Sequence, residues 1–254
     1  MLSANIHSFV FLGDKFILGS TLEPPALLVY NLEQEQRPAD AHTPLLRFLF
    51  AALFRQRTSH ILLTSDPSPG WSPSAGLQVP FHIAGDERII AMNLQYLHPS
   101  GVFRCDTFLI PTKTLLTQIE SLPTKEGNDV DWDLYNLQSV EDVPGHNRWG
   151  VWTCFAFGMR HILPTVVRLH GKPKMIIRDL SPKRRLRASE EEREESNALY
   201  QAMTRGPYEP RPRSILKCVP LPESIRVPQH VNLMISEDCI MVLEEVRHRR
   251  PTFL

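Results

Sequence analysis

Short apolar segments separated by turn residues dominate the start of the chain. Asn5–Leu12 and Lys15–Ser20 are rich in β-branched and aromatic residues, and Gly13 and Asp14 stand between them. Glycine supplies the positive φ that tight hairpin turns require, so this pattern predicts a β-hairpin. Ala26–Leu32 follows as a third strand, and its nearly continuous run of apolar residues predicts burial on both faces.

The same order of segments recurs later in the chain. Ile83–Leu94 repeats the apolar, Gly-Asp, apolar order, and Met234–Glu245 repeats it with Ser236 and Glu237 in the turn. Weak repeats of this kind are typical of stacked or radially arranged sheet units. At roughly four strands per blade, about fourteen candidate strands would supply three to four blades, which is too few for a typical closed ring. We therefore predict a mainly β single domain over residues 1–254, with meandering antiparallel sheets that are β-propeller-like and incomplete.

One or two short helical insertions are expected between the strands. Leu115, Ile119 and Leu122 lie on one face of a segment that follows Pro111, which predicts an amphipathic helix. Ser189 and Glu192 have capping-box spacing before a second helical segment, which we expect to be solvated. The surrounding residues 181–213 are rich in charge and proline, and are predicted to form a partly helical or mobile insertion.

The composition is that of an ordinary globular protein, and we expect it to be intracellular, either cytoplasmic or nuclear. The chain has 254 residues, and its 28 basic and 28 acidic side chains balance, so no global field attracts nucleic acid or a membrane. The longest apolar run, Leu45–Phe54, is interrupted by Arg47 and is far shorter than the roughly 20 residues of a membrane span. No secretion signal is recognisable at the start. The four cysteines form no C-x-x-C motif and are expected to be free, buried thiols: Cys105, Cys154, Cys218 and Cys239.

Sequence patterns for cofactor or metal binding give no positive result. Asp129, Asp131 and Asp133 alternate as at the start of an EF-hand loop, but Leu134 and Val140 occupy the positions of the required glycine and carboxylate. A polar loop is therefore predicted there. No Walker loop, dinucleotide fingerprint or G-x-S-x-G motif occurs. We expect no cofactor, no metal and no catalytic residue.

Histidines and aromatic residues are interpreted as structural. The histidines within or beside strand candidates are expected to be ordinary strand residues with satisfied hydrogen bonds; they are His7, His60, His161 and His230. The aromatic stretch from Trp149 to Phe157 is expected to be a central strand that packs on both faces.

Basic residues concentrate in two places and form the candidate interaction surface. The first group precedes an acidic run that offsets its charge, and the second lies near the C-terminus. Contact with nucleic acid remains an alternative for these segments, although nucleic acid is not the partner that we predict. The candidate residues are Lys183, Arg184, Arg185, Arg187, Arg247, Arg249 and Arg250.

Several of these segments together resemble a known family. The stretches "KFILGSTLEPPALLVYNL", "DTFLIPTKTLLTQIES", "DVDWDLYN", "VWTCFAFGMRHI", "KPKMIIRDLSP" and "MISEDCIMVLEE" resemble the C-terminal half of F-box-like proteins of mushroom-forming fungi. The resemblance implies a propeller-like or related sheet domain that selects substrates for a ubiquitin ligase. In that family an N-terminal F-box binds a Skp-type adaptor, and we expect no F-box here because no helical Leu-Pro-x-Glu-Ile segment precedes the strands.

The sequence therefore predicts a non-enzymatic protein-interaction scaffold whose partners are proteins not identifiable from the sequence. By resemblance it would be the substrate-recognition part of an F-box ubiquitin-ligase subunit, and a Skp-type adaptor would bind only a form that carries the missing F-box. Two alternatives stay open. One is an enzyme with a dispersed polar site at the mouth of the sheets, because catalytic groups can meet in space without a sequence motif. The other is a weak nucleic-acid binder that uses the basic segments.

Overall fold

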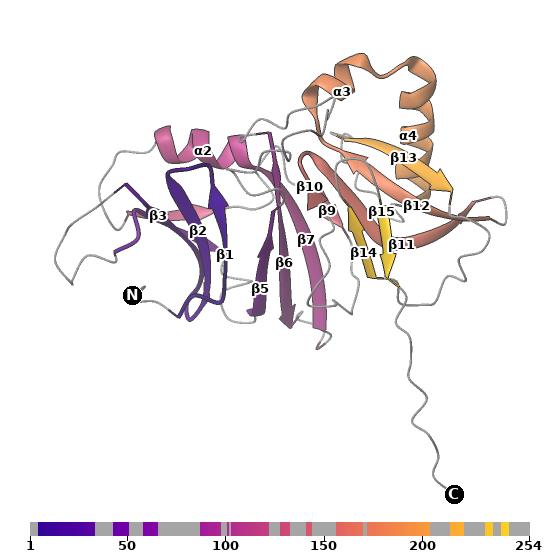
Figure 1. Cartoon of the computed structure of the whole chain (residues 1–254). Coiled ribbons are helices and arrows are strands. Elements are labelled where there is room, and N and C mark those ends of the chain that lie inside the picture. The colour runs from indigo at the N-terminus through magenta and orange to yellow at the C-terminus, as the bar shows by residue number, and fades with distance from the viewer. Residues whose placement is uncertain are drawn as a thin grey trace, which may run out of the picture.

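The computed structural model is mainly β, as predicted, with few helices (Figure 1). It describes residues 5–33, 43–50, 58–65, 87–97, 101, 103–121, 128–132, 141–143, 156–169, 172–203, 214–220, 232–235 and 240–243. Three larger sheets and one isolated hairpin account for the described strands.

The first sheet has five strands in the order β1-β2-β3-β4-β8. Its strands are β1 (Ser8–Leu12), β2 (Phe16–Leu22), β3 (Pro25–Asn31), β4 (Leu46–Phe50) and β8 (Asn128–Trp132). The first four pair antiparallel in chain order, and Gly13 has a φ of 65° in the turn between β1 and β2. The N-terminal hairpin and its turn glycine are therefore confirmed.

The second sheet has four strands in the order β5-β6-β7-β9, and all three pairings are antiparallel. These strands are β5 (Thr58–Thr64), β6 (Ile89–Leu97), β7 (Phe103–Pro111) and β9 (Glu141–Val143). Helix α2 (Thr112–Ser121) follows β7 directly, and Leu115 and Ile119 are buried on its inner face. The amphipathic helix predicted after Pro111 is thus confirmed.

The third sheet has the order β10-β11-β12-β13 and is also antiparallel. Its strands are β10 (Ala156–Phe157), β11 (Arg160–Leu169), β12 (Lys172–Asp179) and β13 (Ile215–Pro220). Between β12 and β13 the chain forms helices α3 (Pro182–Arg187) and α4 (Glu190–Met203). A separate antiparallel hairpin joins β14 (Asn232–Ile235) to β15 (Ile240–Leu243), as the repeat near the C-terminus predicted.

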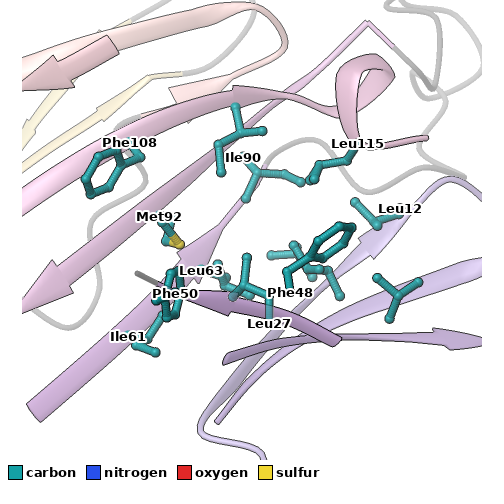
Figure 2. Close-up of a cluster of buried hydrophobic side chains, with 14 of the residues drawn as sticks. Leu12, Leu27, Phe48, Phe50, Ile61, Leu63, Ile90, Met92, Phe108 and Leu115 are labelled. Atoms are coloured by element: carbon teal, nitrogen blue, oxygen red, sulfur yellow. The ribbon is translucent and has the colours of Figure 1, made fainter. Parts of the chain in front are cut away.

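A large hydrophobic core lies between the first and second sheets (Figure 2). Strand β4 contributes Phe48 and Phe50, and β6 contributes Ile90 and Met92 from the opposite side. Leu115 of α2 lies over the same cluster. Burial of apolar surface is the dominant favourable term in folding, so this cluster is what holds the two sheets together.

The second sheet is a middle layer with apolar residues on both faces. Its opposite face places Ile89, Ala91 and Leu109 against Ala156 and Leu180 at the near end of the third sheet. The three sheets thus lie next to one another across the molecule, in the order in which their first strands occur in the chain (Figure 1). Period-2 alternation cannot survive in strands buried on both faces, which explains the continuous apolar runs in this sequence.

Strand β3 has the same two-sided burial that its sequence predicted. Leu27 and Val29 belong to the main core, while Ala26, Leu28 and Tyr30 form a smaller buried cluster on the other face of the sheet. Ile6, Ile17 and Leu49 pack against that smaller cluster.

Two predictions for the loops and helices were wrong. Asp129 and Asp131 do not lie in a polar loop: β8 pairs parallel with β4, and Val130 packs against the main core, while Asp133 lies outside the described residues. Asp129 lies opposite Arg47 and forms an ion pair with its Nε at 3.4 Å. The parallel pairing also departs from a purely antiparallel meander.

The second error concerns helix α4: most of its described side chains are exposed, as expected of a solvated helix, but one face is docked on the third sheet. Its Leu199 and Tyr200 are buried against Ile176 and Leu216 of the third sheet. A helix with few apolar residues can dock on a sheet when two of them, such as Leu199 and Tyr200, are buried against it.

Several predicted features lie outside the described residues. These are the turn at Gly85, the turn residues Ser236 and Glu237, the aromatic residues Trp149 to Phe155, His230, and residues 204–213 of the predicted insertion. None of the described helices combines the length and the apolar character needed to span a bilayer.

Candidate functional site: a basic pocket beside the third sheet

Helix α3 begins with a cap that fixes its direction relative to strand β12. Asp179, the last residue of β12, accepts a hydrogen bond from the Ser181 N–H at 2.9 Å. Ser181 is the N-cap, and its hydroxyl accepts a hydrogen bond from the Arg184 N–H at 3.4 Å. Pro182 occupies the first helical turn, where its missing N–H costs nothing. The basic segment therefore starts as a short helix directly at the sheet edge.

Helix α4 begins with the predicted capping box. The Ser189 hydroxyl accepts from the Glu192 N–H at 3.2 Å, and a Glu192 carboxylate oxygen accepts from the Ser189 N–H at 3.1 Å. Glu192 also pairs with Arg184 of α3, and this contact, followed by the Ser189 N–H bond, lowers the pKa of the Glu192 carboxyl. The same carboxylate thus joins the two helices.

Replacing Ser189 by alanine removes the hydroxyl acceptor and is expected to lower the free energy of unfolding by about 1 kcal/mol. Chemical denaturation at neutral pH checks this value. Ser189→Asp restores an acceptor and should recover most of the loss, whereas equal losses in the two variants would show that the hydroxyl does not act as a cap.

Polar contacts fix α4 against β13, the edge strand of the third sheet. The buried Ser196 hydroxyl accepts from the Leu216 N–H at 2.9 Å, and so satisfies a backbone donor on that edge. The Tyr200 hydroxyl lies 2.7 Å from the Ser214 hydroxyl, and the guanidinium of Arg178 lies 5.6 Å from the centre of the Tyr200 ring. Helix α4 therefore covers a sheet edge that could otherwise pair with a strand of another molecule.

A pocket with a volume of about 340 Å³ lies between α3, α4 and the start of β13. Two arginines, three small polar side chains and two apolar side chains line it. The lining residues are Arg185, Leu186, Arg193, Ser196, Asn197, Ser214 and Ile215. Among the described residues the lining contains no carboxylate, so its charge is positive.

The positive charge of this pocket comes from Arg185 and Arg193. Other basic residues of the segment are engaged elsewhere: Lys183 pairs with Glu87 at 2.8 Å, and Arg184 pairs with Glu192. An Arg193 Nη donates to the Arg185 carbonyl oxygen at 3.3 Å, which ties the two helices at the pocket. Neither Arg185 nor Arg193 pairs with a carboxylate in the part of the chain that the structure describes.

The predicted basic surface is thus only partly assembled at one site. Arg185 lines the pocket, while Lys183, Arg184 and Arg187 lie on the same short helix without lining it. Arg247, Arg249 and Arg250 lie outside the described residues. Sequence reasoning missed Arg193, Asn197 and Ser214, because Arg193 stands in an acidic run and Ser214 joins the site only through the packing of β13.

His161 contradicts the expectation of satisfied strand histidines. Its side chain is 1% exposed, and neither ring nitrogen has a hydrogen-bond partner within the described structure. It lies opposite Arg178 in the β11–β12 pairing. Burial, with the charge of Arg178 as the second cause, lowers the pKa of His161 to about 3. The imidazole is therefore neutral at physiological pH.

Neither a reactive cysteine nor a cluster of metal-binding side chains is found among the described residues. Cys218 is a free, half-buried thiol, and burial raises its pKa, so it is a poor nucleophile. Cys154 and Cys239 lie outside the described residues. Across the described part of the chain, no three His, Cys, Asp or Glu side chains come together as a metal-binding group.

Comparisons of the chain with protein-family models, with curated proteins and with solved structures give no match.

Proposed function

We propose that this protein is a non-enzymatic interaction scaffold that binds an acidic segment of a partner protein in the basic pocket. The observation that carries the proposal is the pair formed by Arg185 and Arg193, which line one cavity where no carboxylate of the described residues neutralises them. Charge-assisted hydrogen bonds from guanidinium groups to carboxylates are among the stronger polar contacts in proteins. The partner supplies the missing anionic groups.

The other lining residues favour a peptide over a small free anion. Leu186 is 79% exposed, and Ile215 adds a second apolar side chain to the lining. The amide of Asn197 can pair with a backbone group of the ligand. A volume near 340 Å³ lies at the lower end of the range for ligand pockets, about 300 to 1,000 Å³, and fits one or two side chains.

A role in binding is also better supported than catalysis at this pocket. The Ser196 hydroxyl is held by the Leu216 N–H, and the Ser214 hydroxyl by Tyr200. Among the described lining residues there is no histidine or carboxylate that could serve as their general base.

We further propose that the sheets around the pocket form an incomplete β-propeller and that the partner is a substrate of a ubiquitin ligase. Three neighbouring, mainly antiparallel sheets are what adjacent blades of an incomplete β-propeller would present. Under the resemblance to F-box-like proteins, the bound partner would be a substrate of a ubiquitin ligase in the cytoplasm or nucleus. A Skp-type adaptor would then bind an F-box and not this pocket.

Binding of a short fluorescent peptide tests the proposal. The probe contains several aspartates and glutamates around a leucine, and fluorescence anisotropy measures its dissociation constant. Arg185→Ala and Arg193→Ala each remove one guanidinium, and each is expected to weaken binding about tenfold or more. Arg187→Ala is the matched control: it removes the same charge from the same helix outside the pocket, and binding should change by less than about twofold.

Three outcomes would overturn the proposal. One is equal weakening by all three variants, which would indicate diffuse attraction to the basic segment. Another is unchanged binding when the acidic residues of the probe are replaced by Asn and Gln. The third is tighter binding of a single-stranded oligonucleotide, with the steep salt dependence of phosphate contacts, which would favour the nucleic-acid alternative.

A further inference from the structure

Two histidines that are distant in the sequence meet where the first and second sheets join. His7 precedes β1, and His60 lies in β5. His7 Nε2 and His60 Nδ1 are 2.8 Å apart. The ring centres are 4.3 Å apart and the ring planes are nearly perpendicular, at 86°. His7 is exposed and His60 is half-buried, so the pair is open to solvent on one side.

Hydrogen bonds to the neighbouring strands hold the backbone on both sides of this pair. The His7 N–H donates to the Ser20 carbonyl oxygen at 2.8 Å. The hydroxyls of Ser8 and Ser20 are 2.9 Å apart, and each lies 3.0 Å from the Ile61 carbonyl oxygen. The Leu63 N–H donates to the Ser8 hydroxyl at 3.0 Å. The residues adjacent to both histidines are therefore fixed relative to each other before any ligand binds.

The nitrogen separation matches one coordination geometry. For metal–nitrogen bonds of about 2.0 Å, two ligands at 90° have nitrogens about 2.8 Å apart, whereas tetrahedral ligands are about 3.3 Å apart. The observed 2.8 Å is the length of the hydrogen bond between these nitrogens, and it is also the spacing of adjacent ligands in a square-planar or octahedral site. Cu²⁺ and Ni²⁺ prefer these geometries with imidazole ligands, and Zn²⁺ prefers the tetrahedral one.

We propose that His7 and His60 form a two-nitrogen site for Cu²⁺ or Ni²⁺, which clamps the start of β1 to β5. The ion takes a lone pair from His7 Nε2 and from His60 Nδ1, and water or other ligands complete its coordination. The proton of the hydrogen bond between these nitrogens moves to the second nitrogen of the same ring that carries it. Two neutral imidazoles can then bind the ion without net proton release.

Titration of untagged full-length protein with Cu²⁺, against glycine as a weak competing chelator, tests this site. Other histidines of the chain can also bind Cu²⁺, so the readout is the difference between wild type and variants. His7→Gln and His60→Gln should each weaken the binding of the same single equivalent of Cu²⁺. The dissociation constant of that equivalent should rise at least about tenfold in each variant. Electron paramagnetic resonance should show the corresponding loss of imidazole nitrogen coupling.

The double variant separates a chelate from two independent ligands. Because the loss of either histidine destroys a chelate, the second substitution should have no further effect. The variant that carries both His7→Gln and His60→Gln should therefore bind as much Cu²⁺ as either single variant. Additive losses would overturn the proposal, as would unchanged binding in both single variants. Ser59→Ala, an exposed neighbour of His60, is the control for folding and should retain the full equivalent. A second readout is thermal: Cu²⁺ should raise the melting temperature of the wild type, and should raise that of the variants less.

Discussion

Replacing Phe48 by alanine is expected to lower the free energy of unfolding by about 3 to 5 kcal/mol. Phe48 is 1% exposed and projects from β4 into the cluster between the first two sheets (Figure 2). The loss combines the transfer energy of the ring with the cavity that it leaves, because strands β3 and β8 on either side of β4 limit collapse. Domains of this kind are stable by only about 5 to 15 kcal/mol, so the variant would be close to unfolding.

Phe103→Ala is the matched control for this measurement. It makes the same chemical change on β7, but its side chain is 56% exposed, and surface substitutions usually cost less than about 0.5 kcal/mol. Urea denaturation of both variants at the same pH gives the comparison. Similar losses in the two variants, or a Phe48→Ala loss below about 1 kcal/mol, would contradict a core that depends on packing between these sheets.

Local sequence patterns were sufficient for the elements whose determinants lie close together in the chain. The hairpin at Gly13 follows from one glycine, and helix α2 follows from two buried positions one turn apart, Leu115 and Ile119. The capping box of α4 needs only Ser189 and Glu192. Each of these features is stabilised mainly by its own neighbours, and so its residues can be recognised without knowledge of the fold.

Features that depend on distant partners could not be predicted in the same way. Strand β8 alternates aspartate with Val130, which is a period-2 pattern, but its identity as a strand depends on a parallel partner, β4, far away in the chain. The pocket is similar: the basic run predicted Arg185, while Arg193 and Ser214 join it through the docking of α4 on β13. Sequence alone indicated a charged segment and gave no indication of a cavity.

His161 shows the same limit for a single buried side chain. The strand that carries it was predicted, but the lack of a hydrogen-bond partner for its ring among the described residues depends on what the neighbouring strands β10 and β12 place around it. An unpaired buried polar group costs about 1 to 3 kcal/mol, so this position weakens the fold. Replacement by leucine removes both ring nitrogens and is expected to leave the stability at neutral pH unchanged or higher.

The larger effect of His161→Leu is expected in acid. In the unfolded chain a histidine takes up a proton near pH 6.5, whereas in the folded protein the pKa of His161 is about 3. Unfolding therefore takes up a proton between these two values. Because the unfolded state binds more protons there, His161 does not reduce the stability through protonation above pH 6.5, and it makes the folded protein progressively less stable as the pH falls toward 3.

The free energy of unfolding falls by about 1.4 kcal/mol per pH unit in this range. Wild type should therefore lose about 2 kcal/mol between pH 6.5 and about pH 5, and His161→Leu should not show this loss. Denaturation curves of both proteins across this interval give the difference directly. Asp179, whose pKa is raised by its burial, titrates in both proteins and so cancels in the comparison. Parallel curves for wild type and variant would mean that the imidazole takes up its proton in the folded state, which is incompatible with an unpaired ring buried beside Arg178.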